Sequence, residues 1–114
     1  MTKFPIIDEE IIQGRDWLVY FIVQNPDGSV RTDLGGATVL CDLRRSPTYP
    51  SIVVSAHGAV TASVLGEVSL WLTGAETDEI EDEYLVGDPK LILQNGETEF
   101  LGRLKVNVIR TGTR

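Results

Sequence analysis

The stretch VQNPDGSVRTDLGGATVLCDLRR, from Val23 to Arg45, decides the fold class, because it places two glycine-containing turns between apolar runs. The segment Asn25-Pro26-Asp27-Gly28 predicts a hairpin turn, since proline presets φ at the second turn position and glycine tolerates positive φ. The pair Gly35-Gly36 predicts a second bend. Neither pair predicts a helix, so the stretch favours strands.

A phosphate-binding loop is the alternative interpretation of Gly35-Gly36. Such a loop lies between a strand and a helix, whose N-terminal N–H groups hold the phosphate. Both flanks of this pair have the pattern of a strand, no lysine follows at the spacing of a P-loop, and the chain contains no GxGxxG. We therefore expect these glycines to turn the backbone and not to bind a ligand.

The run ATVLCDLRR has the alternation of a half-buried strand, with Val39, Cys41 and Leu43 on one face and more polar residues on the other. Comparable short runs, separated by turn residues, continue along the chain and favour an antiparallel β-sandwich in one domain, residues 1–114. We expect about seven to eight strands. Those outside the opening stretch are placed at 17–23, 52–54, 60–63, 67–73, 84–93 and 100–109, with turns at His57-Gly58, Gly66 and 94–97.

Two segments near the N-terminus raise the question of what covers them. The run 17–23 is apolar on both faces, which predicts a central strand with cover on each side, and a partner subunit is one source of that cover. Residues 1–13 carry isoleucines around three acids. They are either an arm that adds a strand to a neighbouring subunit or the first strand of the chain's own sheet.

One helical signal is present. Thr73 and Glu76 have the spacing of a capping box, which predicts a short helical turn near 75–80. The acidic run after it contains Glu79 and Glu81 but lacks the register of an EF-hand, so we expect a solvated turn and no metal site. No cofactor motif is found in the sequence.

Composition limits the partners. The net charge is -7 with a pI near 4.5, which disfavours binding to nucleic acid or to an anionic membrane surface. The first ten residues lack the apolar core of a signal peptide, and no run is long enough to span a bilayer, so synthesis in the cytoplasm is expected.

Catalytic groups are few. His57 is the one histidine, and nothing in the sequence places it beside Cys41 or a serine, so a catalytic triad is disfavoured. Cys41 is expected to be a buried small hydrophobe. The sequence thus predicts a protein that is not an enzyme.

The order of the motifs resembles a known family. The chain resembles small bacteriophage and prophage tail-region proteins. The resemblance rests on Gly14-Arg15-Asp16, the aromatic run after it, NPDGSVRTDLGGATVLCDLRRSP, GEVSLWLTGAET and the closing EYLVGDPKLILQNGETEFLGRLKVNVIRTGTR. A weaker similarity extends to the N-terminal domain of phage baseplate upper proteins. The resemblance implies an Ig-like β-sandwich that serves as a virion structural part, in the tail, baseplate or fibre attachment, with no catalytic residues.

On that basis we expect contacts with other virion proteins and a homo-oligomer, as a ring or trimer, with the virion as its location. Basic residues on the last strand and the acidic run would place opposite charges at two ends for head-to-tail contacts. The expected interface residues are Trp71, Ile109, Arg103, Lys105, Ile6 and Ile11.

Two alternatives stay open at this point. A carbohydrate-binding or head-decoration module would use Trp71, Tyr49 and Tyr84 as aromatic platforms. A hydrolase subunit with a site completed across chains would use His57 as its base.

Overall fold

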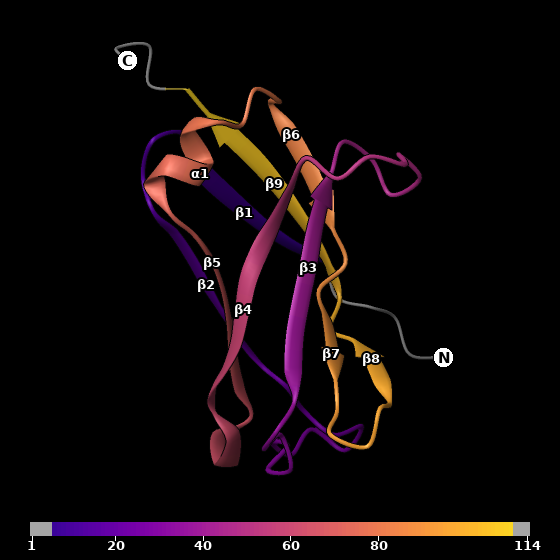
Figure 1. The fold of residues 1–114 in the computed structure, drawn as a ribbon. Helices are drawn as coiled ribbons and strands as arrows, with labels where there is room; N and C mark the ends of the chain where they lie inside the picture. The colour runs from indigo at the N-terminus through magenta and orange to yellow at the C-terminus, as the bar shows by residue number, and fades with distance from the viewer. Residues whose placement is uncertain (1–5, 111–114) are drawn as a thin grey trace.

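The computed structural model describes residues 6–110 and confirms the all-β fold class, with a short helix where the capping box predicts one. Within these residues it has nine strands in one mixed sheet, whose main path runs β1-β9-β6-β3-β4-β5-β2 and leaves β1 and β2 at its two ends (Figure 1). The strands are β1 (Ile6–Ile12), β2 (Trp17–Ile22), β3 (Thr38–Arg44), β4 (Val54–Ala62), β5 (Glu67–Leu72), β6 (Tyr84–Gly87), β7 (Lys90–Ile92), β8 (Thr98–Phe100) and β9 (Arg103–Ile109). A 3-10 turn, η1 (Ser63–Leu65), and a helix, α1 (Gly74–Asp78), complete the fold.

The pairing is antiparallel except at one end. The strand β1 pairs with β9 in parallel, with Ile6 opposite Arg103 and Ile12 opposite Ile109. This pairing places the segment 6–12 in the chain's own sheet, as the second interpretation of the N-terminal segment predicts; residues 1–5 lie outside the described part. No helix in residues 6–110 has the length and apolar character needed to cross a membrane.

The core is formed by the inward residues of the alternating strands. In β3 the side chains of Val39, Cys41 and Leu43 are buried, and in β9 Leu104 and Val106 are fully buried, as the alternation predicts. The turns at 25–28 and 94–97 also form where expected, with Gly28 and Gly96 at positive φ. Turn chemistry and alternation together account for most of the strands.

The segment 52–63 departs from the prediction. A turn is expected at His57-Gly58, but β4 runs through both residues without interruption. Its first part pairs with β3 and its second part with β5, so Gly58 lies where the strand passes from one partner to the other. A Cβ on Gly58 would lie 2.4 Å from the carbonyl oxygen of Val39, so glycine is needed here for a close approach and not for a turn.

Two predicted strands are divided. The segment 84–93 is interrupted at Asp88-Pro89 to give β6 and β7, and 100–109 is interrupted at Gly102, which has φ of 143°. The hairpin turn expected at 25–28 requires a return strand after Gly28, but the pairing there is a single bridge between Gln24 and Val30. Pro89 ends regular pairing between β6 and β7 because proline lacks an N–H donor. Gly102 ends it between β8 and β9 because it adopts backbone angles that other residues avoid.

Candidate interaction surface

The strand β2 lies at the end of the strand order, and within residues 6–110 its strand partner is β5 (Figure 1). This corrects the expectation that 17–23 is a central strand covered on both faces. An edge strand exposes unpaired backbone N–H and C=O groups, which proteins commonly protect with charges, proline or a bulge. The sequence WLVYFI of β2 contains no charged residue, proline or glycine.

The outward face of β2 is apolar and open. Leu18, Tyr20 and Ile22 are 52%, 56% and 51% exposed, while Trp17 and Phe21, on the inward face of the strand, are buried in the core. Apolar residues on both faces therefore mark an uncovered outer face here and not a central position. Exposed apolar residues that line up on one surface indicate an interaction site more strongly than scattered ones.

The other end of the strand order is protected differently. The strand β1 has the sequence IIDEEII, with Asp8, Glu9 and Glu10 in its middle. Charges on an edge disfavour pairing with another strand, above all with a second copy that has the same charges. Of the two terminal strands of the path, β2 is thus the one whose sequence permits edge pairing.

Next to β2 the surface becomes better covered. Trp71 of β5 lies opposite Leu18, and His57 of β4 lies opposite Trp71. The rings of His57 and Trp71 are stacked, with centroids 5.6 Å apart and an interplanar angle of 29°. Trp71 points outward as predicted, but it is half-buried beneath the imidazole.

The imidazole is held by the helix. The His57 Nε2 atom lies 2.9 Å from both carboxylate oxygens of Glu76, which also accepts a hydrogen bond from the backbone N–H of Thr73. These contacts lower the pKa of the Glu76 carboxyl, the Thr73 N–H more than His57. The capping box between Thr73 and Glu76 is complete, as predicted.

This arrangement gives His57 a structural partner on each side. Within residues 6–110 its side-chain contacts are with Glu76 and Trp71, and neither residue is an activated nucleophile. Cys41 is 2% exposed, and burial, more than the nearby Asp42 and Asp88, raises the pKa of its thiol to about 12. A thiol with that pKa is protonated near neutral pH and is a poor nucleophile.

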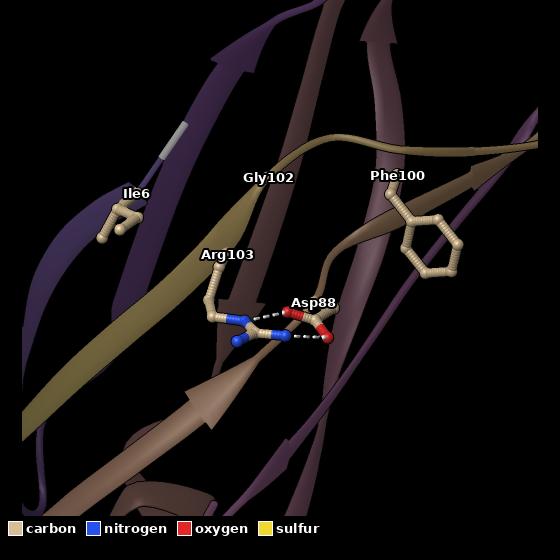
Figure 2. Close-up of a pocket in the computed structure, with 5 residues that line it drawn as sticks. All are labelled: Ile6, Asp88, Phe100, Gly102 and Arg103. Carbon is tan, nitrogen blue, oxygen red and sulfur yellow. Dashed lines mark hydrogen bonds and ion pairs between the residues drawn. The ribbon is translucent and has the colours of Figure 1, made fainter. Parts of the chain in front are cut away.

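The predicted interface residues are dispersed. Ile6 and Arg103 are neighbours in the β1–β9 ladder and line a cavity of about 380 Å³ with Asp88, Phe100 and Gly102. Figure 2 shows the Arg103 guanidinium paired with Asp88, with a distance of 2.8 Å from Nε to Oδ1, between Ile6 and Phe100. Most of the charge that Arg103 would offer a partner is thus already engaged.

The remaining predicted positions lie elsewhere. Ile109 is exposed at the end of β9, and Lys105 is half-buried in the same strand. Ile11 is fully buried in the core, which corrects its expected place on an interface. A buried side chain packs within its own chain and is not accessible to a partner.

The aromatic residues expected to form a sugar platform are also separated. Trp71 is in β5 and covered by His57, Tyr84 begins β6, and Tyr49 lies in the loop after β3, where Arg45 is 5.3 Å from its ring centroid. They therefore come from three different elements of the fold.

The charged residues are mixed and not divided between two ends. Glu81 and Arg110 line the same cavity, Asp82 pairs with Arg45 at 3.0 Å, and Asp88 pairs with Arg103. The separation of charge expected for head-to-tail contacts is therefore not found in residues 6–110. Over the same residues no three His, Cys, Asp or Glu side chains are grouped so that they could hold a metal ion.

The surface formed by Leu18, Tyr20 and Ile22 was not named among the predicted interface residues. The signal that could have identified it is the absence of charge in 17–22 together with apolar residues on both faces. This signal does not by itself distinguish a covered central strand from an open edge, because strand order depends on distant segments.

Comparison with known proteins gives no family. No family model matches the chain, and no curated protein matches it. Among solved structures, the crystal structure of CopC from Methylosinus trichosporium OB3b matches with 15% sequence identity and a TM-score of 0.48, over 92% of this chain and 86% of that chain.

These comparisons correct the expectations drawn from the resemblance. The solved structure described above is CopC and not a phage protein, and neither a family model nor a curated protein connects the sequence with phages. The identification as a phage tail-region protein is wrong. The virion functions and the virion location that were inferred from it are wrong as well. The motifs that suggested it mainly encode turns, strands and a helix cap, which unrelated β-proteins share.

Proposed function

We propose that this protein acts by binding and not by catalysis, and that it associates with a second copy of itself along the edge of β2. The observation that carries the proposal is the uncharged, unprotected edge strand with Leu18, Tyr20 and Ile22 exposed on its outer face. Antiparallel pairing of two such edges would satisfy backbone groups on both and bury apolar side chains at the same time.

The choice of a second copy rests on symmetry and charge. A two-fold axis perpendicular to the sheet at Tyr20 brings two β2 strands together antiparallel and keeps both outer faces on one side. Leu18 of one copy then lies opposite Ile22 of the other, and Tyr20 lies opposite itself. Because β2 carries no charge, this contact brings no like charges face to face, although the whole chain carries a net charge of -7.

Sedimentation velocity over a series of protein concentrations tests this proposal. The wild-type chain is expected to shift from monomer to dimer as concentration rises. Tyr20→Lys should stay monomeric, because a lysine at the centre of the pairing would face the lysine of the second copy. Tyr84→Lys, which changes an exposed tyrosine on β6, is the matched control and should dimerise as the wild type does.

Two results would overturn the proposal. One is a wild-type chain that remains monomeric at its highest soluble concentration. The other is a Tyr20→Lys variant that dimerises with wild-type affinity while its circular dichroism spectrum shows the native fold.

A further inference from the structure

The cavity beside β1 and β9 has two side chains of opposite charge in its wall. Its volume is about 380 Å³, within the range of small-molecule sites, and it is lined by Ile6, Asp88, Phe100, Gly102 and Arg103. None of these residues belongs to β2, so a ligand here does not depend on the proposed dimer edge.

The pairing of the strands brings the lining residues together. Ile6 lies opposite Arg103 in the β1–β9 ladder. Asp88 directly follows β6 and Arg103 begins β9, and the antiparallel register of these two strands places the two residues side by side. In Figure 2 the exposed side chains of Ile6 and Phe100 lie on either side of the charged pair. The site thus combines apolar walls with an ion pair between them.

The ion pair keeps hydrogen-bonding capacity on both partners. The Arg103 Nε donates to Asp88 Oδ1 at 2.8 Å, and its Nη2 donates to Oδ2 at 3.3 Å. In the part of the chain that the structure describes, these two bonds leave the other N–H groups of the guanidinium without an acceptor. Each carboxylate oxygen of Asp88 can also accept a further donor. Because 42% of the Arg103 side chain and 40% of the Asp88 side chain are exposed, a ligand can reach both.

The two charges together select a neutral ligand that carries both signs. A ligand with a single charge is attracted by one member of the pair and repelled by the other, so it gains little. A zwitterion that lies antiparallel to the pair has its carboxylate beside Arg103 and its ammonium group beside Asp88, so both contacts are attractive. In a free amino acid the α-carboxylate and the α-ammonium group are attached to the same carbon atom, so both can contact the pair at once.

We propose that this cavity binds a free α-amino acid with an apolar side chain, its carboxylate on Arg103, its ammonium group on Asp88 and its side chain against Ile6 and Phe100. The apolar walls favour a side chain such as that of leucine, because contact removes apolar surface of both partners from water. The net charge of -7 does not oppose this ligand, because a zwitterion has no net charge of its own.

The test is an NMR titration of the full chain that follows the backbone amide signals of Phe100, Gly102 and Arg103. The probes are leucine, glycine, N-acetyl-leucine and leucine amide, at about pH 6.5, where an α-amino group is protonated. Leucine is expected to give saturable shifts at concentrations several-fold lower than the other three probes. Glycine lacks the apolar side chain, N-acetyl-leucine lacks the ammonium group, and leucine amide lacks the carboxylate.

Two variants should change the selectivity in opposite directions. Asp88→Asn leaves the charge of Arg103 unopposed, so it should weaken leucine binding about two- to fivefold and make N-acetyl-leucine the tighter ligand. Arg103→Gln leaves the charge of Asp88 unopposed and should make leucine amide the tighter ligand. Phe100→Ala should remove most of the preference for leucine over glycine, because it removes one apolar wall.

Arg45 and Asp82 provide the matched control, because they form an ion pair of 3.0 Å that does not line this cavity. Arg45→Gln and Asp82→Asn change the net charge of the chain in the same way, and they should leave the order of the four probes unchanged. This comparison separates contacts within the cavity from a general effect of net charge.

Three results would overturn the proposal. The first is that leucine fails to saturate any of the three signals. The second is that glycine, N-acetyl-leucine or leucine amide binds to the wild type as tightly as leucine does. The third is that the order of the probes stays the same in Asp88→Asn and Arg103→Gln while both variants show a native spectrum. If a variant does not fold, the comparison of the four probes on the wild type still decides the question.

Discussion

Leu18 and Trp71 lie directly opposite each other in the β2–β5 ladder, yet Leu18 is 52% exposed while Trp71 is half-buried beneath the His57 ring. In this row of side chains the middle one, Trp71, is the best covered, while Leu18 on one side and His57 on the other are exposed. The exposure of Leu18 follows from its place on the outward face and not from its chemistry, since Leu72, on the inward face of the same ladder, is 1% exposed.

The first prediction compares these two leucines. Leu18→Ala should change the free energy of unfolding by less than about 0.5 kcal/mol, because the side chain buries little area in the monomer. Leu72→Ala should reduce it by about 2–5 kcal/mol, because it opens a cavity in the core. Urea unfolding at dilute protein concentration measures both. Equal losses of stability would show that Leu18 is packed in the monomer.

The second prediction concerns Gly58. A Cβ at this position would lie 2.4 Å from the Val39 carbonyl oxygen, so Gly58→Ala must push β3 and β4 apart and should cost about 1–3 kcal/mol of stability. Gly35→Ala is the matched control, because nothing lies within 4 Å of the added Cβ and φ is not positive there. Its effect should stay within about 0.5 kcal/mol. A neutral Gly58→Ala in thermal and urea unfolding would contradict the close contact.

The contrast between these two glycines shows where the sequence is informative. Asn25-Pro26-Asp27-Gly28 predicts its turn correctly because the turn depends on the backbone preferences of its own residues. His57-Gly58 also looks like a turn in the sequence. However, glycine is required there because the strand packs closely against Val39, nineteen positions away in the chain. A local pattern cannot separate a glycine that turns the chain from one that admits a neighbouring strand.

The candidate site is subject to the same limit. Alternation correctly places Trp71 on the outer face, and the capping box correctly places Glu76 in α1. That His57 joins these two residues depends on the register between β4 and β5, which no local motif encodes. Likewise, the ion pair between Asp88 and Arg103 depends on the register between β6 and β9.

The third prediction is a pH effect at Glu76. Its pKa in the folded protein lies below the usual value of 4.5, because the Thr73 N–H and then His57 favour the charged form. A lowered folded-state pKa contributes stability that is present above the unfolded-state pKa and is lost as pH falls through the folded-state pKa. Stability should therefore fall below about pH 4.5, and Glu76→Gln should show a smaller fall.

Urea unfolding at about pH 6 and about pH 3 measures this difference. Glu97→Gln serves as the control, since Glu97 lies in an exposed turn. If the stability of the wild type and of Glu76→Gln depended on pH in the same way, the Glu76 carboxylate would not contribute to that dependence.

The fourth prediction concerns the thiol of Cys41. Because burial raises its pKa to about 12 and the side chain is 2% exposed, it should not react with an aromatic disulfide reagent in the native protein near neutral pH. In urea the same thiol should react rapidly and stoichiometrically, which provides the control within one sample. Rapid labelling of a chain that keeps its native circular dichroism spectrum would contradict the buried position.

The last prediction is the effect of salt on the proposed dimer. Two chains of net charge -7 repel at long range, while the β2 edge that they would share carries no charge. Added sodium chloride screens the repulsion and leaves the apolar and backbone contacts intact, so dimerisation should strengthen as ionic strength rises. Sedimentation velocity at low and high salt measures the shift, with Tyr20→Lys as the variant that stays monomeric at both. Association that weakens with salt would instead indicate contacts between opposite charges, and it would place the interface away from β2.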